Sequence, residues 1–222
     1  MNKIKYIAAV LIAIAGLGLQ QAKADFIFNL TVGNSSISGF PGPYATVDVH
    51  LTDPTHATIS FTSLTNGGNI YLFGAVNAVD VNVNATTWTI GSFTATNAGT
   101  GYTPGPVSSG GPGNVDGFGV LNQTVNSTDG NSHASDFISF TLTNTSGTWA
   151  TDTAVLVANA NGAMAAAHIF VTTMPANASR DALTTGFAAN GGAVSTPDGG
   201  TTVMLLGAAL GALGMARRFL KS

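Results

Sequence analysis

The side chains best suited to hold a ligand form a small group in the middle of the chain. Asp129, Asn131 and Asp136 lie close together in the sequence, and Asp116 precedes them. Calcium binds six to eight oxygen ligands and often takes them from Asp and Asn in tight glycine turns. The EF-hand pattern is not met, because no Glu stands at its last position, and Asp-Gly-Asn is also ordinary turn chemistry. Two interpretations remain open: a calcium site, or a plain connection between strands.

Two tryptophans raise a second possibility. Trp88 and Trp149 carry large apolar rings that can stack on sugars in a carbohydrate-binding domain. The alternative is burial between β-sheets, which is the commoner position of aromatic side chains in such folds. The sequence alone leaves both interpretations open.

Catalytic motifs are not found. The chain has no Gly-x-Ser-x-Gly elbow, and its acidic residues are ten scattered aspartates from which no catalytic pair is selected. The four histidines show no metal-ligand spacing, although histidines distant in sequence can converge in a β fold. With no cysteine, disulfides and thiolate metal sites are excluded. We expect no enzymatic activity and, calcium apart, no cofactor.

The end of the chain predicts a single transmembrane helix. Residues 201–216 are uncharged and largely apolar, and Arg217, Arg218 and Lys221 follow in the tail 217–222. At about 1.5 Å per residue the run gives roughly 24 Å of helix, against a hydrocarbon core of about 30 Å. A buried amphipathic helix is the alternative, but no polar stripe occurs at helical spacing. The basic tail places the C-terminus in the cytoplasm.

A short motif precedes this helix. Thr196, Pro197, Asp198, Gly199 and Gly200 form a turn that a helix cannot cross, so the chain is accessible at the outer membrane surface. The order of motif, short helix and basic tail resembles the C-terminal sorting signals of bacterial PEP-CTERM proteins, in the variant that carries Val-Pro-Asp-Ser-Gly or Val-Pro-Asp-Gly-Gly. Thr196 stands where that variant usually has Val. The resemblance implies recognition and cleavage by exosortase, a membrane-embedded transpeptidase, and delivery to the cell surface.

The beginning of the chain predicts export. Lys3 and Lys5 precede an apolar run, and Ala22-Lys23-Ala24 ends it with small residues, so residues 1–24 are predicted to be a signal peptide cleaved after Ala24. From Asp25 to Gly200 the chain contains ten Asp and one Arg, which gives a net charge near −9. Nucleic acid is an unsuitable partner for such a surface, since phosphate binding requires Lys and Arg.

Residues 25–195 are predicted to fold as an all-β ectodomain. Apolar and polar residues alternate with period two in most of the apolar runs, and turn residues separate the runs, as in half-buried antiparallel strands. The Gly- and Pro-rich stretch 94–114 is predicted to be a long loop, and Thr153 to Val157 a strand. With nine to eleven strands and no repeat, we expect an antiparallel two-sheet sandwich of jelly-roll type.

Together these observations favour an exported structural or interaction protein. We expect a membrane-anchored precursor that is processed and then resides at the bacterial cell surface or in extracellular matrix, with extracellular polysaccharide as a candidate partner. The alternative is a calcium- or carbohydrate-binding surface module.

Overall fold

The computed structural model describes residues 25–128, 133–173 and 182–193. These residues form an all-β domain with one short 3-10 turn, η1 (Asp152–Ala154). The strands are β1 (Phe26–Gly33), β2 (Ala45–Asp53), β3 (His56–Ser63), β4 (Thr65–Asn66), β5 (Asn69–Phe73), β6 (Ala75–Val81), β7 (Trp88–Thr96), β8 (Val107–Val115), β9 (Gly119–Ser127), β10 (Phe137–Asn144), β11 (Ala165–Thr173) and β12 (Thr184–Ala193).

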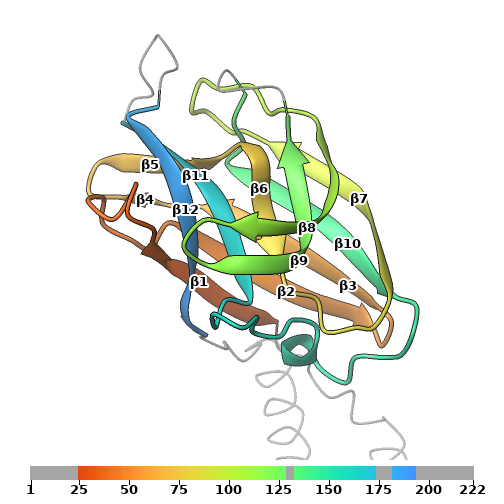
Figure 1. The fold of residues 1–222 in the computed structure, drawn as a ribbon. Helices are drawn as coiled ribbons and strands as arrows, with labels where there is room; N and C mark the ends of the chain where they lie inside the picture. Colours follow the sequence, from red (N-terminus) through yellow and green to blue (C-terminus); the bar gives the residue numbers. More distant parts are fainter. Residues whose placement is uncertain (1–24, 129–132, 174–181, 194–222) are drawn as a thin grey trace, which may run out of the picture. The chain divides into compact units, whose positions relative to one another are not determined.

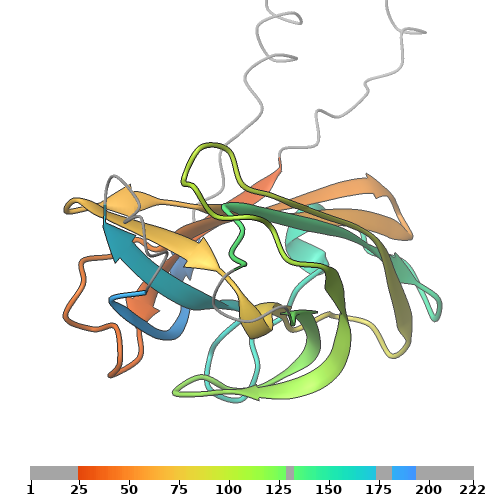
Figure 2. The same ribbon diagram turned by 90° about the horizontal axis from the view of Figure 1, so that it is seen from above.

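All strand pairs are antiparallel, and the pairing is continuous. The order is β7-β10-β3-β2-β1-β12-β11-β6-β9-β8, while β5 pairs with β11 and β4. This single sheet folds over into two layers (Figures 1 and 2). One layer contains β1, β2, β3, β10 and β7, and the other contains β12, β11, β6, β9 and β8. The predicted sandwich is therefore correct in its two layers, but the β1–β12 pairing joins them into one sheet rather than two.

The predicted alternation sets which side chains enter the core. In β2, Val47 and Val49 are fully buried. The polar residues that alternate with them, Asp48 and His50, are partly buried or exposed. Both layers contribute to the core: Phe61 of β3 meets Phe73 of β5 at a centroid distance of 6.2 Å and an interplanar angle of 82°. An edge-to-face pair of this kind adds to the stabilisation from burial itself. The core thus lies between the layers, as the period-two pattern predicts.

The pattern in β7 changes phase at a bulge. Trp88 and Ile90 face the core at even positions, whereas Phe93 does so at an odd position. Ser92, with φ of 52°, and Phe93 together stand opposite Phe140 of β10. An extra residue in one strand reverses the inward face beyond it, which explains why the alternation carries through this segment only with a shift.

The predicted 94–114 loop is wrong over most of its length. Residues 94–96 belong to β7, residues 107–114 belong to β8, and only 97–106 connect the two strands. β8 lies at the sheet edge and pairs only with β9, where a strand tolerates Pro112. Its glycines permit close packing, because a Cβ on Gly113 would lie 2.8 Å from Thr124 Cγ2.

Two further segments differ from expectation. Thr153 to Val157 is not a strand, because Asp152 begins η1 and only Leu156 pairs, with Val83, in an isolated bridge. Conversely, seven of the ten residues of β12 are Ala, Gly or Asn, and Thr184, Thr185 and Phe187 are its only β-branched or aromatic residues. Small residues suit it because it is a central strand: a Cβ on Gly186 would lie 2.5 Å from Asn34 Oδ1.

The first and last described strands are neighbours. Phe28, near the start of β1, pairs with Ala193 at the end of β12. The described domain therefore begins and ends on the same side, where Asp25 also lies beside Asp152 of η1.

Candidate functional site

The predicted targeting and sorting segments lie outside the described residues. They comprise the signal peptide at 1–24, the motif Thr196 to Gly200, the helix at 201–216 and the tail with Arg217, Arg218 and Lys221. Within the part of the chain that the structure describes, no helix has the length and apolar character needed to cross a membrane.

Of the four predicted calcium ligands the structure describes two, Asp116 and Asp136, and these two lie far apart. Asp129 and Asn131 lie outside the described residues. Asp116 is exposed in the β8–β9 turn, where its Oδ2 accepts a hydrogen bond of 2.9 Å from Asn34 Nδ2. Asp136 lies near the opposite end of β9 and accepts a bond of 2.6 Å from the Ala98 backbone amide. The nine residues of β9 span about 30 Å at roughly 3.3 Å each, so Asp116 cannot share an ion with Asp136.

The two tryptophans have different environments. Trp149 is only 2% exposed, and its Nε1 donates to the Asn84 carbonyl at 2.7 Å, so it offers no free ring face to a sugar. Trp88 is partly buried against the core and donates from Nε1 to Gln123 Oε1 at 3.0 Å. Sugar stacking by Trp149 is therefore excluded in this conformation, and Trp88 keeps part of its surface accessible.

A polar depression lies near Trp149. It has a volume of about 410 Å³, and its lining includes Asn84, Thr86, Asn144, Ser146 and Thr148. The hydroxyl and amide groups can donate and accept hydrogen bonds, and no charged side chain lines the depression. This chemistry suits a neutral polar ligand better than an ion.

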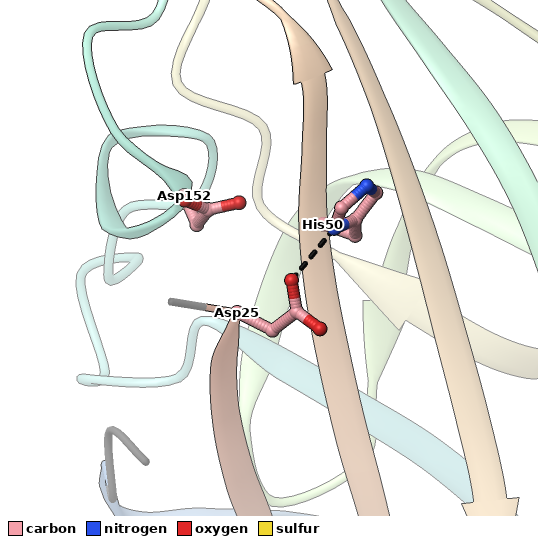
Figure 3. A group of neighbouring side chains, drawn as sticks. All are labelled: Asp25, His50 and Asp152. Atoms are coloured by element: carbon pink, nitrogen blue, oxygen red, sulfur yellow. Dashed lines mark hydrogen bonds and ion pairs between the residues drawn. The ribbon is translucent and has the colours of Figure 1, made fainter. Parts of the chain in front are cut away.

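The only group of metal-ligating side chains found among the described residues is Asp25, His50 and Asp152. One ligand atom from each lies within 4.8 Å of the other two. Figure 3 shows Asp25, just before β1, joined by a dashed line to His50 of β2, with Asp152 of η1 close by. The pairing of Phe26 with Val49 places Asp25 beside His50 across the two strands. Strand register, rather than sequence spacing, therefore brings these residues together.

Each of the three side chains is held differently. His50 Nδ1 donates to Asp25 Oδ1 at 2.6 Å, and both side chains are partly exposed, at 53% and 39%. Asp152 is only 4% exposed, and its Oδ1 accepts a bond of 2.5 Å from the Leu51 backbone amide. The cluster therefore combines one fixed, buried carboxylate with two side chains that can move.

The electrostatic setting is strongly negative. The hydrogen bond that His50 donates to Asp25 raises the pKa of His50, and the charges of Asp25, Asp152 and Asp48 act in the same direction, while partial burial opposes them. Burial raises the pKa of Asp48, and the charges of Asp25 and Asp152 raise it further. Asp48 Oδ1 is buried and has no hydrogen-bond partner. Three carboxylates thus surround a single imidazole.

A second pair provides an internal comparison. His56 Nδ1 lies 2.8 Å from Asp53 Oδ2, with side chains 45% and 48% exposed. Its distance and exposure resemble those of the Asp25–His50 pair, but it belongs to no group of three possible ligands among the described residues. The Asp25–His50 pair therefore differs from the Asp53–His56 pair in having a third possible ligand, the carboxylate of Asp152.

Sequence reasoning did not find the cluster. Asp25 and His50 are 25 positions apart and His50 and Asp152 are 102 positions apart. No local sequence motif links them. The one visible signal was the alternation of polar Asp48 and His50 with buried valines on β2, which indicates a polar outer face. His168 lies outside the cluster: it is partly buried, and its Nδ1 is 3.2 Å from the Val76 carbonyl.

Comparison with known proteins gives one result. No curated protein and no solved structure matches the chain. The VPDSG-CTERM motif matches residues 197–219, a segment that begins at Pro197 and includes both Arg217 and Arg218. Thr196 falls outside the match. Such a signal indicates an exported, surface-associated protein, and residues 197–219 are a C-terminal sorting signal of the PEP-CTERM/VPDSG type.

Proposed function

We propose that this protein is exported, held in the membrane by its C-terminal segment and processed there by an exosortase-type transpeptidase. The β domain then serves as a structural or interaction component of the cell surface or extracellular matrix, without enzymatic activity of its own. The observation that carries the proposal is the sorting motif at 197–219. This segment combines a cleavable turn, a short apolar run and a basic end, which are the parts that membrane arrest and cleavage require.

The positions of the domain ends support this route. Because Phe28 pairs with Ala193, the chain enters and leaves the domain at one end. Such an arrangement suits a domain that is attached to the membrane through both ends during translocation. Neither end has to pass around the domain to reach the bilayer. Three residues separate Ala193 from Pro197, and the four Cα-to-Cα steps between them reach at most about 14 Å. Processing therefore takes place close to this end of the domain.

The surface chemistry supports a passive role. No Lys or Arg occurs among the described residues. Outward positions of β3 and β10 carry Thr and Ser, for example Thr58, Thr62 and Ser139. Such hydroxyl groups can exchange hydrogen bonds with polysaccharide without covalent chemistry.

The decisive experiment replaces the motif in the native host. Pro197→Ala combined with Asp198→Ala removes the turn and its carboxylate, and we expect full-length precursor to accumulate in the membrane fraction. The matched control changes the same two residue types elsewhere, Pro175→Ala with Asp181→Ala. Intact-mass analysis of the released protein locates both processed ends. Release of the motif variant at the parent level would refute the assignment.

The basic tail gives a second, separable test. Replacing Arg217 and Arg218 with Gln should disturb orientation or retention, because the positive charges hold one end of the helix on the cytoplasmic side. Accessibility of a C-terminal tag to protease from outside the cell reports orientation directly. A tail variant that keeps the parent orientation and yield would contradict this role of the arginines.

Glycan binding is the second candidate function, and the polar depression beside Trp149 favours it over calcium binding. Thr86→Val with Thr148→Val removes two hydroxyls from its lining while keeping side-chain shape. Loss of retention on a polysaccharide column in this variant would support glycan binding. Equal retention of parent and variant would leave the structural role ahead.

A further inference from the structure

The cluster of Asp25, His50 and Asp152 carries an inference that does not depend on sorting. We propose that these three side chains bind one divalent transition-metal ion of the zinc class. Their ligand atoms, two carboxylate oxygens and one imidazole nitrogen, already lie within 4.8 Å of one another (Figure 3). Three protein ligands with a remaining position open to water form a common zinc coordination set.

The geometry allows an ion to enter with small movements. Zinc binds imidazole nitrogen and carboxylate oxygen at about 2.0–2.2 Å, so tetrahedral donor atoms lie about 3.4 Å apart. His50 Nδ1 and Asp25 Oδ1, now 2.6 Å apart, must separate by less than about 1 Å. Both side chains are partly exposed and free to make this change. Asp152 is already positioned, because its Oδ1 accepts a hydrogen bond from the Leu51 amide and its surroundings bury it.

The charge balance also calls for a cation. Asp48, Asp25 and Asp152 contribute three carboxylates against one imidazole, and no Lys or Arg is present among the described residues. Asp48 Oδ1 is buried without a hydrogen-bond partner, so its charge is only weakly compensated in the protein as it stands.

The donor set selects the metal. Calcium requires six to eight oxygen ligands, whereas this cluster offers one nitrogen and few oxygens. Imidazole together with carboxylate suits zinc and similar transition metals. The ligand residues also differ entirely from the acidic group around residues 116–136, so the proposal is independent of the predicted calcium site.

The test is titration of metal into the purified, chelator-treated mature protein. We expect zinc to bind with one-to-one stoichiometry, and at about a hundred times its Kd to raise Tm by roughly 5–10 °C. Cobalt serves as a spectroscopic probe, because tetrahedral cobalt absorbs strongly in the visible range and reports the ligands directly. Calcium should produce neither effect at the same concentration.

Two histidine variants make the test specific. His50→Ala should weaken zinc binding more than about tenfold, since loss of a supporting partner alone often has that effect. His56→Ala, in the equally exposed Asp53–His56 pair, should bind as the parent does. Asp25→Asn provides a second ligand variant at an exposed side chain. The proposal is overturned if zinc does not bind at concentrations up to millimolar, if the two histidine variants lose zinc affinity equally, or if calcium binds more tightly than zinc.

Discussion

Asp80 is the least favourably placed ionisable group of the described domain, and replacing it should reveal this. Asp80 of β6 is fully buried, and neither carboxylate oxygen has a hydrogen-bond partner. Val79 and Val81 on either side join the main core, so Asp80 faces the opposite surface of the sheet, where its strand neighbours are Ala166 and Thr124. Burial therefore raises the pKa of Asp80 well above its ordinary value of 3.8.

The sign of the pH effect follows directly. Below pH 3.8 the carboxyl is protonated in both the folded and the unfolded chain, so it does not change stability with pH. Above this value the unfolded state ionises while the folded state stays neutral, and the free energy of unfolding falls. The slope is about 1.4 kcal/mol per pH unit until the pKa of the folded protein is reached. Asp80→Asn removes the ionisation and keeps the shape of the neutral acid.

Urea unfolding of parent and Asp80→Asn at a series of pH values between 4 and 7 measures the effect. The variant should be close to the parent near pH 4 and gain stability relative to it as the pH rises towards the pKa of folded Asp80. Other titrating groups contribute to both proteins and cancel in the difference. A difference that does not change with pH would show that water reaches Asp80, and the reasoning from its burial would be wrong.

Three further outcomes are expected. Asp53→Asn should have the opposite pH dependence to Asp80→Asn. Hydrogen bonds from the Thr55 amide and His56 lower the pKa of Asp53, so its carboxylate stabilises the fold at neutral pH and loses this effect in acid. Urea unfolding of parent and variant at both pH values checks this. His168→Gln should reduce the loss of stability of the parent between pH 7 and pH 5.5, because burial lowers the pKa of His168 and the unfolded chain is protonated first; thermal melts at both pH values check this. Gly186→Ala should destabilise by about 1–3 kcal/mol through its clash with Asn34, whereas Gly147→Ala, whose Cβ meets only Asn144 at 3.9 Å, should melt as the parent does.

The fold was predictable where one face of a strand is polar. In β2 and β10 the alternation of apolar and polar residues specifies which side enters the core, and the structure follows it. It was not predictable where glycine packs closely against a neighbour. The composition of β8 and β12 signals loops by propensity, yet an edge position and a crowded central position make the same residues suitable for strands.

The candidate metal cluster was unpredictable for a different reason. Its ligands meet through the register of β1 against β2 and through a turn that arrives from more than a hundred positions away, and neither is encoded in local spacing. The sorting segment shows the converse. Its chemistry is a linear order of a turn, an apolar run and charges, so the sequence alone was sufficient to identify it.

The candidate metal cluster lies at the end of the domain where β1 begins and β12 ends. Asp25 stands immediately before β1, and β1 pairs at this end with the last residues of β12, only a few positions before the sorting motif. A metal bound by the three side chains would hold η1 against β1 and β2 at this end of the domain.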